Sequence, residues 1–212
     1  MASSAMNDFS DLVRQRRSCH HFMAGFRLSD ASFFEILQDV RYTPSGYNAQ
    51  PWEFLLIRDE AQRKAVQSLA FGQDHIMTSG NIVILLGNTE FGKDEQERIC
   101  KYWEYRLPPE KLKAMKSSLM KERPAEQKRD MVIRNCALAG MTFMYSAKSK
   151  GFITCPMMGF SQGRLAKLLE LPEKIIPVLM IAIGKPDPEN PEPAQLERKE
   201  AKEIGHLEEY KK

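Results

Sequence analysis

The sequence predicts one α+β domain over residues 1–212, and three observations carry this prediction. The chain has 212 residues, of which 42% are hydrophobic and 28% charged, values typical of a globular domain with its own core. Short apolar runs are expected to form strands, and they lie at 54–57, 82–86, 151–155 and 175–183. Longer segments with apolar residues at helical spacing separate these runs, so helices are expected between the strands.

Charge and cysteine content argue against several classes of protein. The net charge is only +3 and no basic tract is present, so no nucleic-acid partner is expected. The longest uncharged helical run, Asn135–Ala147, is too short to span a bilayer, and Met1–Ser10 lacks a signal-peptide pattern. The four cysteines form no CxxC pair and no zinc spacing, which favours a reduced, cytoplasmic protein without a bound metal.

Three helices are predicted in the first third of the chain, at 6–15, 29–40 and 59–69. Ser29 is a good N-cap for the second helix, and Asp30 follows in its first turn. The apolar residues expected on the inner faces are Phe9, Leu12 and Val13 in the first helix, Phe33, Ile36, Leu37 and Val40 in the second, and Ala61, Ala65 and Leu69 in the third.

The stretch Pro44–Trp52, with the sequence PSGYNAQPW, reads as a turn that enters a strand. Its proline, glycine and asparagine favour tight bends, and Gln50 precedes a proline, which biases Gln50 toward extended geometry. A polar loop delivered by a buried strand suits a planar, hydrogen-bonding ligand. The alternative is a loop that only caps its own backbone, and these residues alone favour that interpretation.

The second half of the chain is mainly helical by its pattern. A charged helix ends near Arg106, and Pro109 is well placed to start the next one, whose apolar stripe is Leu112, Met115, Leu119 and Met120.

A long helix is predicted from Pro124 to Lys150. Its uncharged part, Asn135–Ala147, is apolar on all faces and must be buried all round, which a subunit interface would achieve most completely. A homodimer is therefore expected. A short helix follows at 161–169, and a proline-rich, extended arm at 185–212.

The segment Arg14–Phe22 closes the first helix with three arginines and a serine. The cations could simply favour the C-terminal end of the helix dipole. Phosphate binding is the functional alternative, because an arginine fork and a serine hydroxyl match phosphate oxygens well.

Taken together, the segments RRSCHHF at 16–22 and PSGYNAQPW at 44–52 resemble the nitroreductase family of FMN-dependent oxidoreductases. That family carries an Arg-x-Ser-x-basic-x-Phe signature and a Pro-Ser-x-x-Asn-x-Gln-Pro-Trp signature. The resemblance extends to Gly151–Thr154 with Met158–Phe160, and to Leu171–Glu173, so it covers nearly the whole chain. The matching signature residues are Arg16, Ser18, Phe22, Pro44, Ser45, Asn48, Gln50, Pro51 and Trp52.

The resemblance implies a nitroreductase-like fold, with a central mixed and mainly antiparallel sheet flanked by helices, in an intertwined homodimer. It implies FMN as the cofactor and NADH or NADPH as the co-substrate. The residues implied to bind the cofactor are Arg16, Arg17, Ser18, His20, Pro44, Ser45, Gly46, Asn48, Gln73, Arg198 and the backbone of Met158 and Gly159.

For two of these implied contacts, more than one residue of this sequence could occupy the family position. Gln73 is preferred to Gly72 for the flavin-edge contact because only Gln73 has a side chain to offer. Arg198 is the natural match for the basic phosphate contact in the arm, but the usual Arg-x-Pro context is absent and Lys199 stays open. His75 is left out of the site, since a lone histidine is more often a surface or satisfied core residue.

The resemblance further makes 91–123 a variable helical insert that forms a mobile cover over the substrate cavity, and 185–212 an arm that crosses to the partner subunit. Tyr102 and Trp103 of the insert are candidate substrate platforms. Ordinary packing of these two aromatic residues is about equally favoured.

The implied activity is hydride transfer from NAD(P)H through flavin N5 to a small acceptor, with both substrates using one flavin face in turn. Nitroaromatics, quinones and enones are all possible acceptors, and no catalytic side chain is demanded. Two alternatives remain: a flavin-binding or sensor protein with little turnover, and a purely structural helical homodimer without a cofactor.

One residue departs from the family pattern. The place two residues after the signature serine usually holds Arg or Lys near the N1–O2 edge of the flavin, and here it holds His20. Histidine carries a charge only when protonated, so the flavin potential is expected to depend on pH through this residue. Alternatively, His20 points away and only caps the preceding helix.

Overall fold

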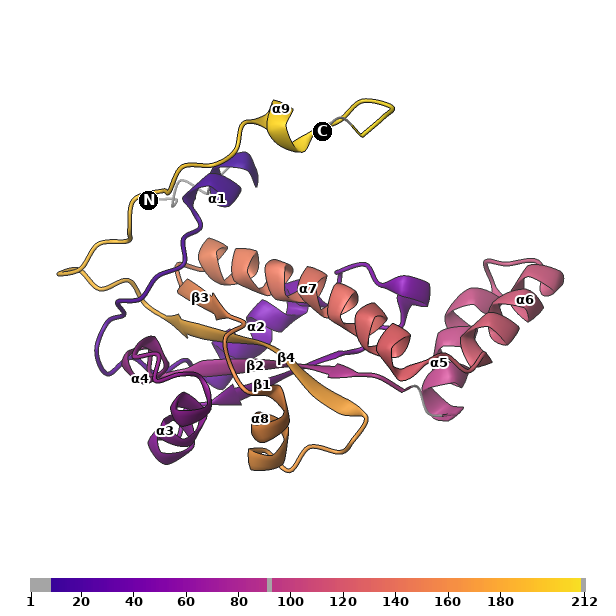
Figure 1. Ribbon diagram of the computed structural model, residues 1–212, viewed down its shortest axis with the longest axis horizontal. Helices are drawn as coiled ribbons and strands as arrows, with labels where there is room; N and C mark the ends of the chain where they lie inside the picture. Colours follow the sequence, from indigo (N-terminus) through magenta and orange to yellow (C-terminus); the bar gives the residue numbers. More distant parts are fainter. Residues whose placement is uncertain (1–8, 91–92, 211–212) are drawn as a thin grey trace.

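The computed structural model describes residues 9–90 and 93–210. Within them the chain forms an α+β fold in which helices cover both faces of one sheet (Figure 1). The strands are β1 Trp52–Ile57, β2 Ile82–Asn88, β3 Ile153–Met157 and β4 Ile175–Gly184. The helices are α1 Phe9–Gln15, α2 Asp30–Val40, η1 Gly46–Asn48 (a 3₁₀ turn), α3 Glu60–Leu69, α4 His75–Thr78, α5 Lys93–Glu104, α6 Pro109–Met120, α7 Ala125–Ser149, α8 Gln162–Leu168 and α9 Ala201–Ile204.

The sheet has the strand order β1-β2-β4-β3, and every neighbouring pair is antiparallel. The central strand β2 is buried along its whole length, as its apolar run predicts. Its residues alternate between two cores: Ile82 and Ile84 face a layer with α3, α4 and α8, whereas Val83 faces a layer with α2 and α7. In Figure 1 the long helix α7 therefore lies on one side of the sheet and α3 and α8 lie on the other.

Local capping signals set several helix boundaries as predicted. The Ser29 hydroxyl accepts a hydrogen bond from the Ser32 N–H at the start of α2, and Asp59 accepts one from Gln62 at the start of α3. Pro109 is the first residue of α6, where the missing N–H costs nothing. The predicted start of the first helix at Met6 lies outside the described residues.

The predicted inner face is wrong for α1 and only partly right for α3. In α3 Leu69 is buried as predicted, but Arg63 and Val66 are the other buried residues, because the larger Val66 side chain reaches the core while Ala61 is exposed. In α1 no residue is buried, and Phe9 is 69% exposed, with an edge-on ring contact to Tyr145 of α7. The apolar face of α1 is thus left open to solvent in the single chain.

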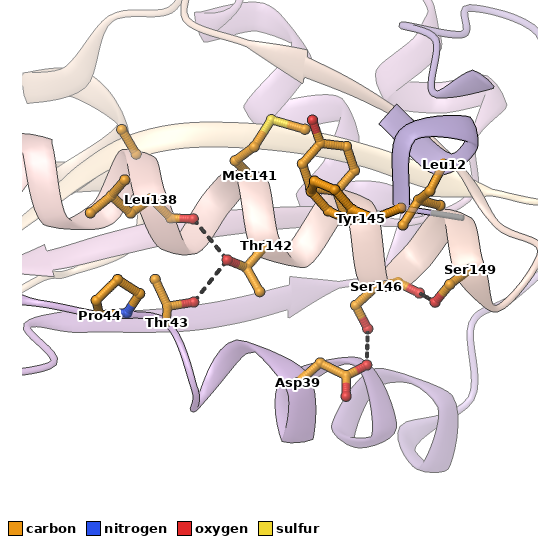
Figure 2. A pocket seen from close by; sticks show the side chains of 12 residues that line it. Leu12, Asp39, Thr43, Pro44, Leu138, Met141, Thr142, Tyr145, Ser146 and Ser149 are labelled. Atoms are coloured by element: carbon orange, nitrogen blue, oxygen red, sulfur yellow. Dashed lines mark hydrogen bonds between the residues drawn. The ribbon is translucent and has the colours of Figure 1, made fainter. Parts of the chain in front are cut away.

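Within a single chain the uncharged stretch of α7 is buried on one face only, so the predicted burial all round would need a partner subunit. Phe143 and Ala147 are fully buried against the sheet, whereas Leu138 is 50% exposed. Together with α1 and the end of α2, the open face of α7 lines an apolar hollow of about 600 Å³ (Figure 2). Side chains that Figure 2 labels around it include Leu12, Thr43, Pro44, Leu138, Met141 and Tyr145.

Two parts of the chain extend away from the sheet. The hairpin of α5 and α6, which is the described part of the 91–123 insert, projects beyond one end of α7 (Figure 1). After β4 the arm is extended up to α9, as its prolines predict, and runs back past α1 at the other end of the molecule. The last two residues of the predicted arm, 211–212, lie outside the described residues.

Candidate functional site

The N-terminal signature segment lies against β3 at the outer edge of the sheet, joined to it by one isolated bridge. Ser18 forms a parallel bridge with Thr154 of β3, and the Cys19 N–H donates to the Thr154 carbonyl at 3.0 Å. Cys19 and Phe22 are buried and anchor the segment in the core. Because side chains alternate along an extended chain, Ser18 and His20 point away from that core, toward the surface.

This segment and the C-terminal arm enclose a cationic hollow of about 370 Å³. Its lining residues are Arg16, Arg17, Ser18, His20, His21, Pro191, Pro193, Ala194, Gln195, Leu196 and Arg198. The structure thus brings together four predicted cofactor residues from the N-terminal segment with Arg198, more than 170 positions later in the chain. Lys199, the alternative to Arg198, does not line the hollow.

The guanidinium of Arg16, which lines this hollow, carries an unsatisfied hydrogen-bond donor. Its Nη1 atom is buried and has no hydrogen-bond partner among the residues that the structure describes. A buried polar group without a partner is costly, and an arginine fork pairs best with carboxylate or phosphate oxygens. A phosphate group in the hollow would supply the missing acceptor, so the residues present fit the phosphate of a nucleotide cofactor.

Next to the hollow lies a second group of predicted residues, on the loops before α4 and after β3. The Gln73 side chain donates to the Gly159 carbonyl at 3.1 Å and to the Ala70 carbonyl at 3.1 Å. Gln73, Met158 and Gly159 are therefore neighbours, as the resemblance implies. The Met158 side chain is 84% exposed.

His75, which the sequence gave no reason to include, lies in the same region. Its ring stacks on that of His20, with centroids 4.8 Å apart and an angle of 7° between the planes. Burial, and then the nearby His20, lower the pKa of His75, while Asp74 acts in the opposite direction. The His75 Nε2 atom is buried without a hydrogen-bond partner within the described ranges. No local signal could have revealed this pair, because 55 positions separate its members and only the fold brings them together.

The second signature, the Pro44–Gln50 turn, is strongly bent. Tyr47, Asn48 and Gln50 all have φ between 49° and 57°, in the left-handed region that non-glycine residues rarely adopt. Each such residue costs on the order of 1 kcal/mol or more, and it persists only where its surroundings fix it. Within the turn, the Ser45 hydroxyl accepts from the Gln50 N–H at 3.0 Å. These contacts correct the expectation that the proline after Gln50 keeps that residue extended.

Contacts from the long helix and the insert hold the turn in place. The Gly46 N–H donates to the Asn135 side chain of α7 at 3.0 Å, and the Trp103 indole N–H donates to the Tyr47 carbonyl at 3.0 Å. Trp103 is half-buried in a small core with the turn, which fits the packing alternative for this residue. Tyr102 is 42% exposed, and its hydroxyl accepts from Arg98, so its role as a substrate platform stays a prediction.

The two signatures lie at opposite corners of the sheet in one chain. The turn precedes Trp52 of β1, and the sheet register places Trp52 level with Ile176, near the start of β4. Ser18 is bridged to Thr154 of β3, and Thr154 is level with Ile183, near the end of β4. Seven residues of a strand span about 23 Å, and crossing from β1 to β3 adds three strand spacings of about 4.8 Å each. Pro44, Ser45, Gly46 and Asn48 are therefore too far from the cationic hollow of the same chain to share one phosphate site with it.

The cysteines near the site do not offer reactive thiolates. Burial is the main cause that raises the pKa of Cys19 to about 12 and that of Cys155 to about 11. At neutral pH both thiols are therefore protonated and poor nucleophiles. In the part of the chain that the structure describes, no group of three or more His, Cys, Asp or Glu residues is arranged to hold a metal ion. Over 9–90 and 93–210, no helix has the length and apolar character needed to cross a membrane.

The structure thus shows an α+β fold with a cationic hollow at the edge of its sheet, lined by Arg16, Ser18 and Arg198. Comparison with known proteins gives the family. The model of the nitroreductase family matches residues 13–185, and the chain belongs to this family of oxidoreductases.

Individual relatives agree with this assignment. MhqN of Bacillus subtilis strain 168, whose name describes an NAD(P)H nitroreductase, is 29% identical over 196 residues, which cover 89% of this chain and 93% of MhqN. The crystal structure of YdfN from Bacillus subtilis, described as a nitroreductase, aligns with a TM-score of 0.84 at 27% identity and covers 94% of this chain and 98% of YdfN. A structure from Exiguobacterium sibiricum, described as a nitroreductase in complex with FMN, has a TM-score of 0.80 at 22% identity and covers 98% of this chain and 100% of that one.

Proposed function

We propose that this protein is an FMN-dependent NAD(P)H oxidoreductase that reduces a small acceptor, such as a nitroaromatic, a quinone or an enone. The observation that carries the proposal is the cationic hollow lined by Arg16, Ser18 and Arg198, in which Arg16 Nη1 is buried and has no partner among the residues described. The family membership and the FMN named for the Exiguobacterium sibiricum structure support the choice of cofactor. The chemistry supplied at this site would be hydride transfer from NAD(P)H to flavin N5 and on to the acceptor.

The residues of the chain have the task of binding and orienting the cofactor. Arg16 and Arg198 would bind the phosphate as charge-assisted hydrogen-bond donors, with Ser18 as a further partner. Gln73 fixes the backbone of the Gly159 loop through its hydrogen bond, so that the N–H groups of Met158 and Gly159 are held in one position. His20 and His75 place titratable groups beside this region.

We further propose that the functional unit is a homodimer in which the cofactor lies between two chains. The turn and the cationic hollow lie at opposite corners of one chain, and a two-fold arrangement would bring the turn of one copy to the hollow of the other. The open apolar faces of α1 and α7 support this arrangement, since a partner would bury both. Within this proposal, the arm from 185 onward lies over the partner, and the buried, unpaired cysteines suit a reduced cytoplasm.

A test of the proposal begins with the purified protein. FMN is expected to copurify without a covalent bond, and heat release followed by chromatography against FMN and FAD standards identifies it. A panel of nitroaromatic, quinone and enone acceptors, each with NADH and NADPH, then identifies the acceptor and the preferred reductant. A colourless protein that does not take up added FMN would refute the proposal, and a yellow protein without turnover would instead favour the flavin-sensor alternative.

A further inference from the structure

The α5–α6 hairpin has a small core of its own, and that core includes the turn. Its buried members within the hairpin are Ile99, Cys100, Met115 and Leu119, with Trp103, Leu107 and Leu112 packed against them. The remaining members of this cluster are Tyr47 and Ala49, both from the turn. The hairpin therefore packs on the signature turn, even though the resemblance describes the same region as a mobile cover.

Hydrogen bonds tie the same two parts together at three places. The Trp103 indole N–H donates to the Tyr47 carbonyl at 3.0 Å, and Arg98 Nη2 donates to the Ala49 carbonyl at 3.1 Å. Two side chains of α5 thus donate hydrogen bonds to carbonyl groups of the turn. From α6, the Ser118 hydroxyl lies 3.1 Å from the Tyr47 hydroxyl. Arg123 Nη2 donates a hydrogen bond to the Ser118 carbonyl at 2.8 Å and so holds Ser118 in place.

The turn needs such support because its backbone is strained. Tyr47, Asn48 and Gln50 adopt left-handed φ values, and Tyr47 has no glycine-like freedom to do so without cost. A strained segment populates its native conformation only when surrounding contacts favour it, and ligand affinity falls in proportion to the population that is competent to bind.

We propose that the α5–α6 hairpin is a positioning element for the signature turn, holding it in the strained conformation that contacts the flavin. This inference rests on the proposed function, since it assumes that the turn meets FMN. Trp103, Arg98 and Ser118 are then positioning residues that act through the turn and do not touch the cofactor. Because coupling between two parts is reciprocal, FMN bound at the turn also stabilises the hairpin.

The matched test compares two tyrosine-to-phenylalanine changes. Tyr47→Phe removes the hydroxyl that meets Ser118, whereas Tyr105→Phe removes a hydroxyl from a 96% exposed side chain just after α5. Apoprotein of each is titrated with FMN, and the dissociation constant is read from flavin fluorescence. Tyr47→Phe and Trp103→Phe are each expected to raise the dissociation constant about five-fold and to shift the visible spectrum of bound FMN, while Tyr105→Phe leaves both unchanged.

Amide hydrogen exchange supplies a second measurement. If the hairpin only stabilised the fold, the effect of FMN on exchange in the hairpin would be the same in the wild type and in Tyr47→Phe. In the wild-type protein, added FMN is expected to slow amide exchange in 93–120, and this effect should be smaller in Tyr47→Phe. Should Trp103→Phe fail to fold, Ser118→Ala gives a second variant, because it removes the other partner of the Tyr47 hydroxyl contact from α6.

The outcomes separate the two levels of the proposal. A wild-type protein that binds no FMN removes the proposed function and this inference with it. A wild-type protein that binds FMN, together with Tyr47→Phe, Trp103→Phe and Ser118→Ala variants of unchanged affinity and spectrum, overturns only the positioning role. Exchange in 93–120 that does not respond to FMN would also overturn it.

Discussion

Arg16 is the residue whose environment most directly indicates a bound anion. Its Nη1 is buried and has no hydrogen-bond partner within 9–90 and 93–210, which predicts that Arg16→Gln weakens FMN binding by about 10- to 100-fold, because a hydrogen bond to a charged group is worth about 1.5–3 kcal/mol. Titration of the apoprotein with FMN measures the change. Arg14→Gln is the matched control: Arg14 lies two positions earlier, is exposed and does not line the hollow. Equal losses in both variants would mean that only the net charge of the segment matters.

The neighbouring residue His20 is expected to tune the flavin. An arginine there carries a permanent charge that stabilises an anionic reduced flavin, whereas histidine changes its charge between about pH 5 and pH 8. His20→Arg is therefore expected to raise the midpoint potential at pH 8 by roughly 30 mV, which corresponds to about 1.4 kcal/mol for a two-electron couple. Spectroelectrochemical titration of both proteins at pH 8 measures the difference, and equal midpoint potentials would remove His20 from the flavin site.

His75 gives a prediction that does not depend on any cofactor. Its pKa is lowered in the folded protein, by burial first and by His20 second, against the opposing charge of Asp74. The unfolded chain, with a histidine pKa near 6.5, then binds more protons than the folded chain just below that pH. The contribution of His75 to the free energy of unfolding is therefore fully present above about pH 6.5, and it is lost as the pH falls toward the pKa of His75 in the folded protein.

Urea unfolding at pH 7.5 and at pH 5.5 measures this dependence. His75→Gln is expected to lose less stability than the wild type between the two pH values. His206→Gln, which changes an exposed histidine in the arm, should keep the wild-type difference. If His75→Gln and the wild type respond alike, the stacked pair does not carry the effect.

At the scale of elements, the close approach of β2 and α7 sets the tightest packing constraint. A Cβ added at Gly87 would overlap Val132 Cγ1 and lie 3.1 Å from Cys136 Sγ, so Gly87→Ala forces the strand and the helix apart. It is expected to lower the free energy of unfolding by about 1–3 kcal/mol. Gly163→Ala is the matched control, because nothing lies within 4 Å of its Cβ and α8 gains helix propensity of about 0.5 kcal/mol. Urea unfolding should therefore move the two variants in opposite directions.

Elements were predictable from the sequence where their signals are local. The apolar run of β2, the Ser29 cap of α2 and the proline that starts α6 act within a few residues, and each is found where the sequence places it. The inner face of α3 was only partly right because Val66 fills the core better than the smaller alanines do. Burial of α7 on one face depends on what other segments leave uncovered, which no periodicity within the helix can reveal.

The candidate site was predictable to the same extent. The residues of each signature follow from sequence motifs, but contacts between distant segments decide which of them meet. The stacking of His20 on His75, the tie from Trp103 to the turn and the separation of the two signatures are all of this kind. They arise from the order of strands in the sheet, which the residue types of the motifs do not specify.

For the whole molecule, the decisive question is whether the apolar hollow of α7 is covered by a second copy. Single exposed apolar residues are ordinary, but here Phe9, Leu138, Met141 and Tyr145 line one continuous hollow of about 600 Å³. The same region adjoins Pro44 at the start of the turn, so covering it would also bring a partner next to the turn that we propose contacts the flavin. Assembly and cofactor binding are therefore expected to depend on each other.

Leu138→Glu tests this dependence. It places a charge in the centre of the proposed interface, and burying an unpaired carboxylate there costs several kcal/mol, which raises the dissociation constant of the dimer at least about 100-fold. Light scattering after size exclusion at micromolar concentration is expected to show a dimer for the wild type and a monomer for Leu138→Glu, with FMN lost from the monomer. Leu168→Glu changes a leucine of similar exposure, 44% against 50%, on α8 outside the hollow, and it should remain a dimer with its flavin. A Leu138→Glu protein that stays monomeric yet retains FMN would show that one chain completes the site, and one that stays dimeric would place the interface elsewhere.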